Sequence, residues 1–119
     1  MRALALGILA VAVLLLAGCS EPIPQARLAY AGDWRANQMR LVITPEGYCE
    51  YSRRKEGGNS NTINAPIQRF EGDNFVVGIG LFTTTFIVSR PPHLDGGQWK
   101  MTVDGVELTR VAAADEVRT

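Results

Sequence analysis

The sequence is poor in the residue types that form most catalytic and metal sites. It contains one histidine, His93, and two cysteines, Cys19 and Cys49. A zinc site takes three or four Cys, His or carboxylate ligands at short spacing, and the sequence has no such cluster. Motifs for a phosphate loop, a nucleophile elbow or a Cys-His pair are also missing. We therefore expect no enzyme activity, no metal and no cofactor.

An excess of positive charge is also missing. The chain has 12 Lys and Arg residues and 12 Asp and Glu residues, whereas a nucleic-acid-binding domain is expected to be clearly basic. The one basic cluster, Arg53-Arg54-Lys55, stands beside the Gly-rich stretch EGGNSN and is typical of a solvated strand end. The composition predicts no nucleic-acid partner.

The longest apolar run lies at the N-terminus. Residues 3–16 are all apolar or Gly, and this length of about 14 fits a secretory signal but not the roughly 20 residues that span a bilayer. Arg2 precedes the run and small residues follow it, as in such signals. These features predict an export signal.

The run ends in Leu16-Ala17-Gly18-Cys19, which resembles the lipobox of bacterial lipoproteins at all four positions. The resemblance implies signal peptidase cleavage between Gly18 and Cys19, and lipidation of Cys19 with a diacylglycerol and a fatty acid such as palmitate. Several acyl chains make a stable membrane anchor, because each buried CH2 contributes about 0.8 kcal/mol. Ser20 resembles the residue found after the cysteine in outer-membrane lipoproteins, so we expect the periplasmic face of the outer membrane.

These features divide the chain into four parts. We expect a cleaved signal peptide over residues 1–18, a lipidated cysteine and extended linker over residues 19–27, a β-barrel-like domain over residues 28–111, and a frayed tail over residues 112–119. Two prolines within Glu21-Pro22-Ile23-Pro24-Gln25 favour an extended spacer. Once Cys19 is lipidated, Cys49 has no cysteine partner.

From residue 28 onward, short β-rich runs alternate with turn signals, and no helical period is evident. This pattern predicts an all-β fold, either a small antiparallel barrel or a flattened sandwich of seven or eight short strands. Pro66 is predicted at a sheet edge or a bulge, because proline cannot donate a ladder hydrogen bond. The chain is expected to leave the sheet at Pro91-Pro92.

Two hairpins are predicted in detail. Asp104-Gly105 between alternating runs is a strong turn signal, and it places Val103 opposite Val106 with both side chains on the core face. Pro45-Glu46-Gly47 predicts a second hairpin with a left-handed Gly. In that register Cys49 lies on the apolar face, as a small buried hydrophobe and not as a nucleophile.

Gly32-Asp33-Trp34 resembles the Gly-x-Trp start of lipocalins, whose fold is an eight-stranded up-and-down barrel. The resemblance implies a late arginine, Arg110, in cation–π contact with Trp34 or Trp99. It also implies the alternative function of carrying a small apolar ligand, with the candidate pocket residues Trp34, Phe75 and Phe86. Bulky apolar residues, Phe82 among them, could instead fill the interior themselves.

The preferred function is a tethered, non-enzymatic interaction module that presents loops to another envelope protein, because binding functions gather on loops held by a rigid scaffold. The candidate loops span residues 53–61 and 90–98. Their candidate binding residues are Arg53, Arg54, Lys55, Asn59, Asn61, His93 and Asp95. A further alternative is a hydrolase inhibitor that acts through one exposed loop.

The anchor prediction is tested by replacing the lipobox cysteine. Cys19→Ala removes the sulfur that would carry the diacylglycerol, so we expect metabolic labelling with radioactive palmitate to be lost and unprocessed precursor to accumulate. Cys49→Ala is the matched control and should leave both labelling and processing unchanged. Labelled, normally processed Cys19→Ala protein would contradict the prediction.

Overall fold

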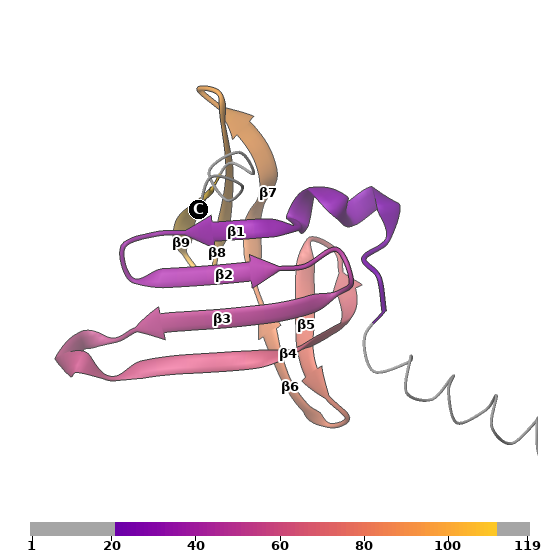
Figure 1. Cartoon of the computed structure of the whole chain (residues 1–119), viewed down its shortest axis with the longest axis horizontal. Coiled ribbons are helices and arrows are strands. Elements are labelled where there is room, and N and C mark those ends of the chain that lie inside the picture. Colours follow the sequence, from indigo (N-terminus) through magenta and orange to yellow (C-terminus); the bar gives the residue numbers. More distant parts are fainter. Residues whose placement is uncertain (1–20, 112–119) are drawn as a thin grey trace, which may run out of the picture.

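The computed structural model describes residues 21–111, which form one antiparallel sheet and two short 3-10 helices (Figure 1). The all-β prediction is confirmed, with nine strands in place of the expected seven or eight. The elements are η1 (Gln25–Tyr30), β1 (Gly32–Arg35), β2 (Met39–Ile43), β3 (Tyr48–Arg54), η2 (Glu56–Gly58), β4 (Ser60–Glu71), β5 (Asn74–Ile79), β6 (Phe82–Phe86), β7 (Val88–Asp95), β8 (Gln98–Val103) and β9 (Val106–Arg110).

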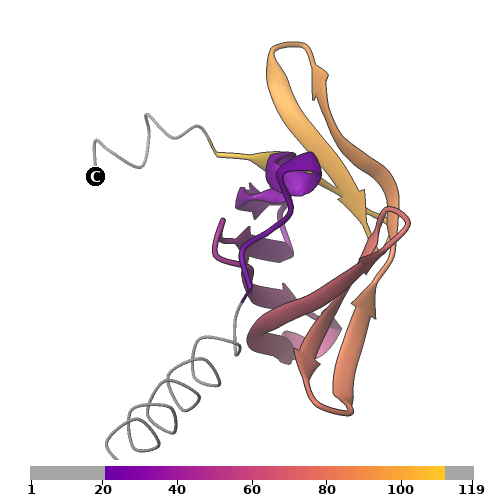
Figure 2. The ribbon, with the colours of Figure 1, turned by 90° about the vertical axis from the view of Figure 1, so that its right-hand side faces the viewer.

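The sheet consists of two antiparallel runs of strands that meet at β1 and β9. The strand order is β6-β5-β4-β3-β2-β1-β9-β8-β7, so neighbours in space are neighbours in sequence except at the β1–β9 pair. The sheet curls into an open half-barrel, with β1–β3 on one side, β5–β8 on the other, and β4 crossing between them (Figure 2). The apolar faces of the strands line the inside of this curl.

Both predicted hairpin registers are confirmed. Val103 pairs with Val106 and Met101 with Leu108, and both Asp104 (φ 48°) and Gly105 (φ 81°) have positive φ, as a type I′ turn requires. In the other hairpin Ile43 pairs with Cys49, and the amide of Thr44 donates to the carbonyl oxygen of Tyr48 over 2.9 Å.

Cys49 is fully buried, as the hairpin register predicts. Desolvation by burial, with a smaller contribution from the charge of Glu50, raises the pKa of the Cys49 thiol to about 12. Because the thiolate is the reactive form, this cysteine is a packing residue and not a nucleophile at neutral pH.

The core is rich in aromatic contacts. Trp34 is fully buried, and its indole Nε1 donates to the carbonyl oxygen of Tyr30 over 2.9 Å. Phe75 and Phe86 stack with ring centroids 5.1 Å apart, and Tyr51 packs edge-on against Phe86 at 4.9 Å. The expectation that Phe82 fills the interior is wrong, since this side chain is 88% exposed next to the β5–β6 turn.

Strand β4 changes partner halfway along its length. Residues 60–66 pair with β3, residues 67–71 pair with β5, and the register shifts between Ile67 and Arg69. Pro66 is the last residue of the first half and pairs with Tyr48, and the irregularity begins one residue later, after Ile67. The change of partner turns the chain from one side of the half-barrel to the other.

The prediction of a loop over residues 90–98 is wrong for most of these residues. Residues Arg90–Asp95 belong to β7, and only Gly96-Gly97 form the turn into β8. Pro91 and Pro92 are tolerated because β7 is the last strand of the sheet and its register shifts between Arg90 and His93. An edge strand needs hydrogen bonds on one side alone, so two prolines do not end it.

The folded part begins earlier than Leu28, where the sequence placed it. Ile23 is buried in the core, and its amide donates to the carbonyl oxygen of Pro45 over 3.0 Å. Gln25–Tyr30 form the 3-10 helix η1, so the last three residues of the linker predicted over residues 19–27 are helical and not extended. Gly47 (φ 93°) permits this packing, because a Cβ there would overlap the carbonyl oxygen of Glu21.

Gly32 provides a test of the β1–β9 junction. It has φ +146°, and an added Cβ would lie 2.5 Å from Cδ of Arg110, whose guanidinium lies over the rings of Trp34 and Trp99. Gly32→Ala should therefore strain the backbone and displace Arg110, which lowers the free energy of unfolding by about 2 kcal/mol or more. Urea denaturation followed by circular dichroism measures this loss.

Gly57→Ala is the matched control, because Gly57 also has positive φ (87°) but nothing lies within 4 Å of its added Cβ. We expect that variant to lose about 1 kcal/mol from backbone strain alone. Equal losses in the two variants would show that the contact with Arg110 does not stabilise the junction.

Candidate functional site

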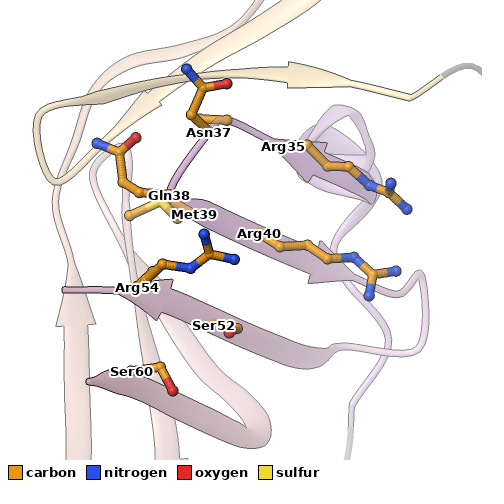
Figure 3. Close-up of a pocket in the computed structure, with 9 residues that line it drawn as sticks. Arg35, Asn37, Gln38, Met39, Arg40, Ser52, Arg54 and Ser60 are labelled. Atoms are coloured by element: carbon orange, nitrogen blue, oxygen red, sulfur yellow. The ribbon is translucent and has the colours of Figure 1, made fainter. Parts of the chain in front are cut away.

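An arginine-lined hollow lies on the outer face of strands β1–β3, opposite the core. Side chains alternate across a strand, so Met39 and Leu41 point into the core while Arg40 between them points out. The same alternation turns Arg35, Ser52 and Arg54 outward. The hollow has a volume of about 300 Å³ and is lined by Arg35, Ala36, Asn37, Gln38, Met39, Arg40, Ser52, Arg54 and Ser60 (Figure 3). We call it the arginine hollow.

Asp33 holds two of its arginines in place. Arg35 donates to both carboxylate oxygens of Asp33 through Nε and Nη2, over 3.1 and 2.9 Å, and Arg40 does the same over 3.3 and 3.1 Å. Bidentate pairs of this kind fix the orientation of a guanidinium group. Asp33 is buried although it is charged, whereas the side chains of both arginines are about half exposed.

The clamp keeps Asp33 ionised. Burial opposes the charged form of this carboxyl, but the hydrogen bonds from Arg35 and Arg40, aided by their charges, outweigh burial and hold its pKa below the usual value. The Asp33 carboxylate therefore stays charged when the pH falls to the range in which an ordinary aspartate becomes protonated. Arg35 and Arg40 remain oriented over the whole neutral range.

Arg54 adds a third guanidinium to the hollow. Its backbone amide donates to the carbonyl oxygen of Gln38 over 2.8 Å, which ties the end of β3 to the β1–β2 turn. Its side chain extends toward Arg40 (Figure 3). No carboxylate in the described part of the chain pairs with Arg54. With three arginines and one aspartate, the hollow carries an excess of two positive charges.

Two further hollows on the same face share residues with the arginine hollow. One, of about 590 Å³, is lined by Arg35, Arg40 and residues along β1 and β2, and the other, of about 210 Å³, by Arg40, Ser52 and residues of β3 and β4. Arg40 borders all three. Together they form a shallow polar track across four strands, which suits an extended ligand better than a small enclosed one.

The arginine hollow has the chemistry that recognises negative charge, whereas the smallest of the three hollows is also bordered by an acidic residue, Glu50. Guanidinium groups match carboxylate and phosphate oxygens geometrically and cannot be deprotonated in proteins. Within residues 21–111 no group of three or more His, Cys, Asp or Glu side chains could hold a metal ion.

The structure brings some of the predicted binding residues to this site. Arg54 and the neighbouring Ser60 line the hollow, while Lys55 and Asn59 lie in the connection beyond it, joined by a 2.6 Å hydrogen bond from the Lys55 amide to the Asn59 carbonyl oxygen. Arg53 and Asn61 are paired strand residues of β3 and β4. The loop predicted over residues 53–61 is therefore shorter in the structure, where it covers residues 55–59.

His93 and Asp95 are not part of the site. They lie on β7, an edge strand that four other strands separate from β3 in the sheet, and the β7–β8 turn lies apart from the β3–β4 connection (Figure 1). Nδ1 of His93 lies 2.8 Å from the carbonyl oxygen of Pro91, and the buried Nε2 has no partner within the described residues. The two predicted loops thus do not form one surface.

The candidate pocket residues are core residues. Trp34, Phe75 and Phe86 are each at most 1% exposed and belong to one apolar cluster. The contact of Arg110 predicted from the lipocalin resemblance is present with both tryptophans, at 5.8 Å from the ring centroid of Trp34 and 4.9 Å from that of Trp99. Gly18 and Cys19 lie outside the described residues.

Comparison with protein families, curated proteins and solved structures finds no match to this chain. No helix within residues 21–111 is long and apolar enough to cross a bilayer.

Sequence reasoning missed Asp33, Arg35 and Arg40 as site residues. Their meeting depends on the β1–β2 register, in which Arg35 pairs with Arg40 and Asp33 with Val42. The available signal was the pattern Met39-Arg40-Leu41, in which a charged residue alternates with core residues and must point outward.

Proposed function

We propose that the protein is a lipid-anchored, non-enzymatic lipoprotein of the bacterial cell envelope whose arginine hollow binds an acidic segment of another envelope protein. The observation that carries the binding proposal is the clamp on Asp33. It fixes two guanidinium groups beside a third that has no carboxylate partner among the described residues. A preoriented site loses less side-chain freedom when a ligand binds.

The shape of the face favours an extended partner. The three hollows that meet at Arg40 run across β1–β4 and are bordered by hydroxyl and amide side chains such as Ser52, Thr62 and Asn64. A peptide segment with several carboxylates could engage Arg40 and Arg54 together, with polar side chains completing its hydrogen bonds. Several weak charge contacts at a polar surface give specificity more than high affinity.

The packing of the interior favours this proposal over the carrier alternative. Phe75 stacks on Phe86, and Tyr30 packs edge-on against Phe75 with centroids 6.2 Å apart. An interior that is filled by its own rings offers little room for an apolar ligand. The anchor itself comes from the lipobox resemblance and from the export signal before it.

Site-specific photo-cross-linking in living cells tests the binding proposal. A benzoylphenylalanine at Ser60, which is exposed and lines the arginine hollow, should give a discrete adduct with an envelope protein. Arg54→Gln should reduce the adduct about tenfold, because a charge-assisted hydrogen bond contributes about 1.5–3 kcal/mol. Soluble polyglutamate should compete with the partner in isolated envelopes, and polylysine should not.

Two controls separate this site from general surface charge. Lys55→Gln removes a neighbouring positive charge outside the hollow and should leave the adduct unchanged. Benzoylphenylalanine at Ser89, an exposed position of β7, should give no such adduct. Equal losses in Arg54→Gln and Lys55→Gln, or an adduct that polyglutamate does not displace, would contradict the proposal.

A further inference from the structure

An exposed apolar cluster lies at the turn between β5 and β6. Its side chains are Ile79, Leu81 and Phe82, which are 70%, 97% and 88% exposed. We call these three residues the apolar tip. Together they form a contiguous apolar projection at the end of a hairpin, which is unusual for a surface that meets only water.

The whole hairpin is free of charged side chains. Residues 75–89 contain no Asp, Glu, Lys, Arg or His. Natural edge strands usually carry charges or prolines that keep them in water, as β7 does with Arg90, Pro91 and Pro92. Strand β6 is the other edge of the sheet and has neither. The composition of this hairpin suits an apolar environment, in which burying a charge costs free energy.

The apolar tip lies at the end of the molecule away from the β7–β8 turn, and the described chain begins in this same half of the molecule (Figures 1 and 2). The side-chain amide of Gln68 donates to the carbonyl oxygen of Gly80, in the turn, over 3.1 Å. Gln68 also lines a hollow of about 400 Å³ whose other wall is formed by Glu21, Pro22, Ile23 and Pro24. Gln68 therefore lies between the turn, to which it is hydrogen-bonded, and the hollow that the entering segment also lines.

This position relates the tip to the anchor. Cys19 precedes Glu21 by two residues, and two residues of extended chain reach at most about 7 Å. If Cys19 carries lipid, as the proposed function requires, Glu21 and the hollow beside it lie at the membrane surface. The apolar tip is then held at the level where acyl chains begin.

We propose that the apolar tip inserts into the membrane that holds the lipid anchor and so gives the domain a fixed orientation on it. The occupant of this surface is a lipid bilayer. The inference rests on the proposed lipid anchor and goes beyond it, because a lipid on a linker tethers a domain without orienting it. Ile79, Leu81 and Phe82 can enter the boundary of headgroups and acyl chains, a depth of about 5–10 Å.

The hydrogen bonding of the turn fits shallow insertion. A backbone carbonyl that enters apolar surroundings needs a donor, and Gln68 supplies one to Gly80. Arg27 and Arg69 line the hollow beside the turn, and each faces a carboxylate, of Asp73 at 3.9 Å and of Glu71 at 2.7 Å. Glu21 also lines this hollow, so the hollow offers no excess of positive charge, and insertion should depend on apolar area more than on anionic lipid.

The test uses the acylated protein in vesicles of phosphatidylethanolamine and phosphatidylglycerol, with an environment-sensitive dye on a cysteine at the tip (Leu81→Cys). Cys49 is buried and its thiol pKa is about 12, so the introduced cysteine is labelled selectively. The control is Leu94→Cys, an exposed apolar residue (62%) near the β7–β8 turn. This turn lies at the opposite end of the molecule in both views (Figures 1 and 2).

We expect quencher lipids to quench the dye at position 81 about fivefold more than the dye at position 94. Replacing both neighbours, Ile79→Ser with Phe82→Ser, should abolish the difference, and circular dichroism should show an unchanged fold because both side chains are exposed. Equal quenching at positions 81 and 94 would overturn the inference.

Two further outcomes separate this inference from the proposals on which it rests. Mass spectrometry of the same preparation reports acylation of Cys19. If Cys19 is not acylated, the proposed anchor is absent and the inference that rests on it is overturned as well. If Cys19 is acylated but the dye at position 81 is not quenched, the insertion of the apolar tip alone is overturned. A concentration-dependent blue shift in detergent without lipid quenching would assign the tip to a second copy of the chain and overturn the membrane assignment.

Discussion

The fold depends on the contact of Arg110 with two tryptophans, where β1 meets β9. These strands share only two residue pairs, Trp34 with Arg110 and Arg35 with Thr109, and one further hydrogen bond runs from the Val111 amide to the Asp33 carbonyl oxygen over 2.8 Å. So short a ladder contributes little by itself. The guanidinium over both rings adds cation–π attraction of about 0.5–2 kcal/mol per contact, depending on desolvation. Without this junction no strand pairing would join the two runs, which would be connected by the chain at Ile87 and by the hydrogen bond from the Val88 amide to Oδ1 of Asn74.

The same short strand carries both the core and the recognition chemistry. In β1, Trp34 points inward to the aromatic core while Asp33 and Arg35 on either side point outward and form the clamp with Arg40. Anything that shifts β1 against β2 therefore changes the packing and the arginine hollow together. The three arginines of the site lie on strands, which favours precise positioning of their guanidinium groups, while the β1–β2 turn completes the lining. The proposed apolar tip lies on another hairpin, so membrane contact and partner binding can be altered separately.

Local turn chemistry made much of the fold predictable from the sequence. Asp104-Gly105 and Pro45-Glu46-Gly47 fix hairpin registers, and a one-residue slip would expose the apolar face, so the pairing of Ile43 with Cys49 follows from pattern alone. Strand β7 was missed because Pro91 and Pro92 read as a break unless the strand is known to be an edge. Burial of Ile23 was missed because it depends on the later turn at Gly47. The arginine hollow was missed for a similar reason, since it requires three strands in register.

The junction between β1 and β9 can be observed directly by nuclear magnetic resonance of the folded protein. Nuclear Overhauser effects between the Arg110 side chain and the indole protons are short-ranged, and the guanidinium lies 5.8 Å and 4.9 Å from the ring centroids of Trp34 and Trp99. We predict cross-peaks from Arg110 to both rings, with its side-chain resonances shifted upfield by the ring currents. Unshifted Arg110 resonances without a cross-peak to either tryptophan would contradict the arrangement in which β9 packs against β1 and joins the two runs of strands.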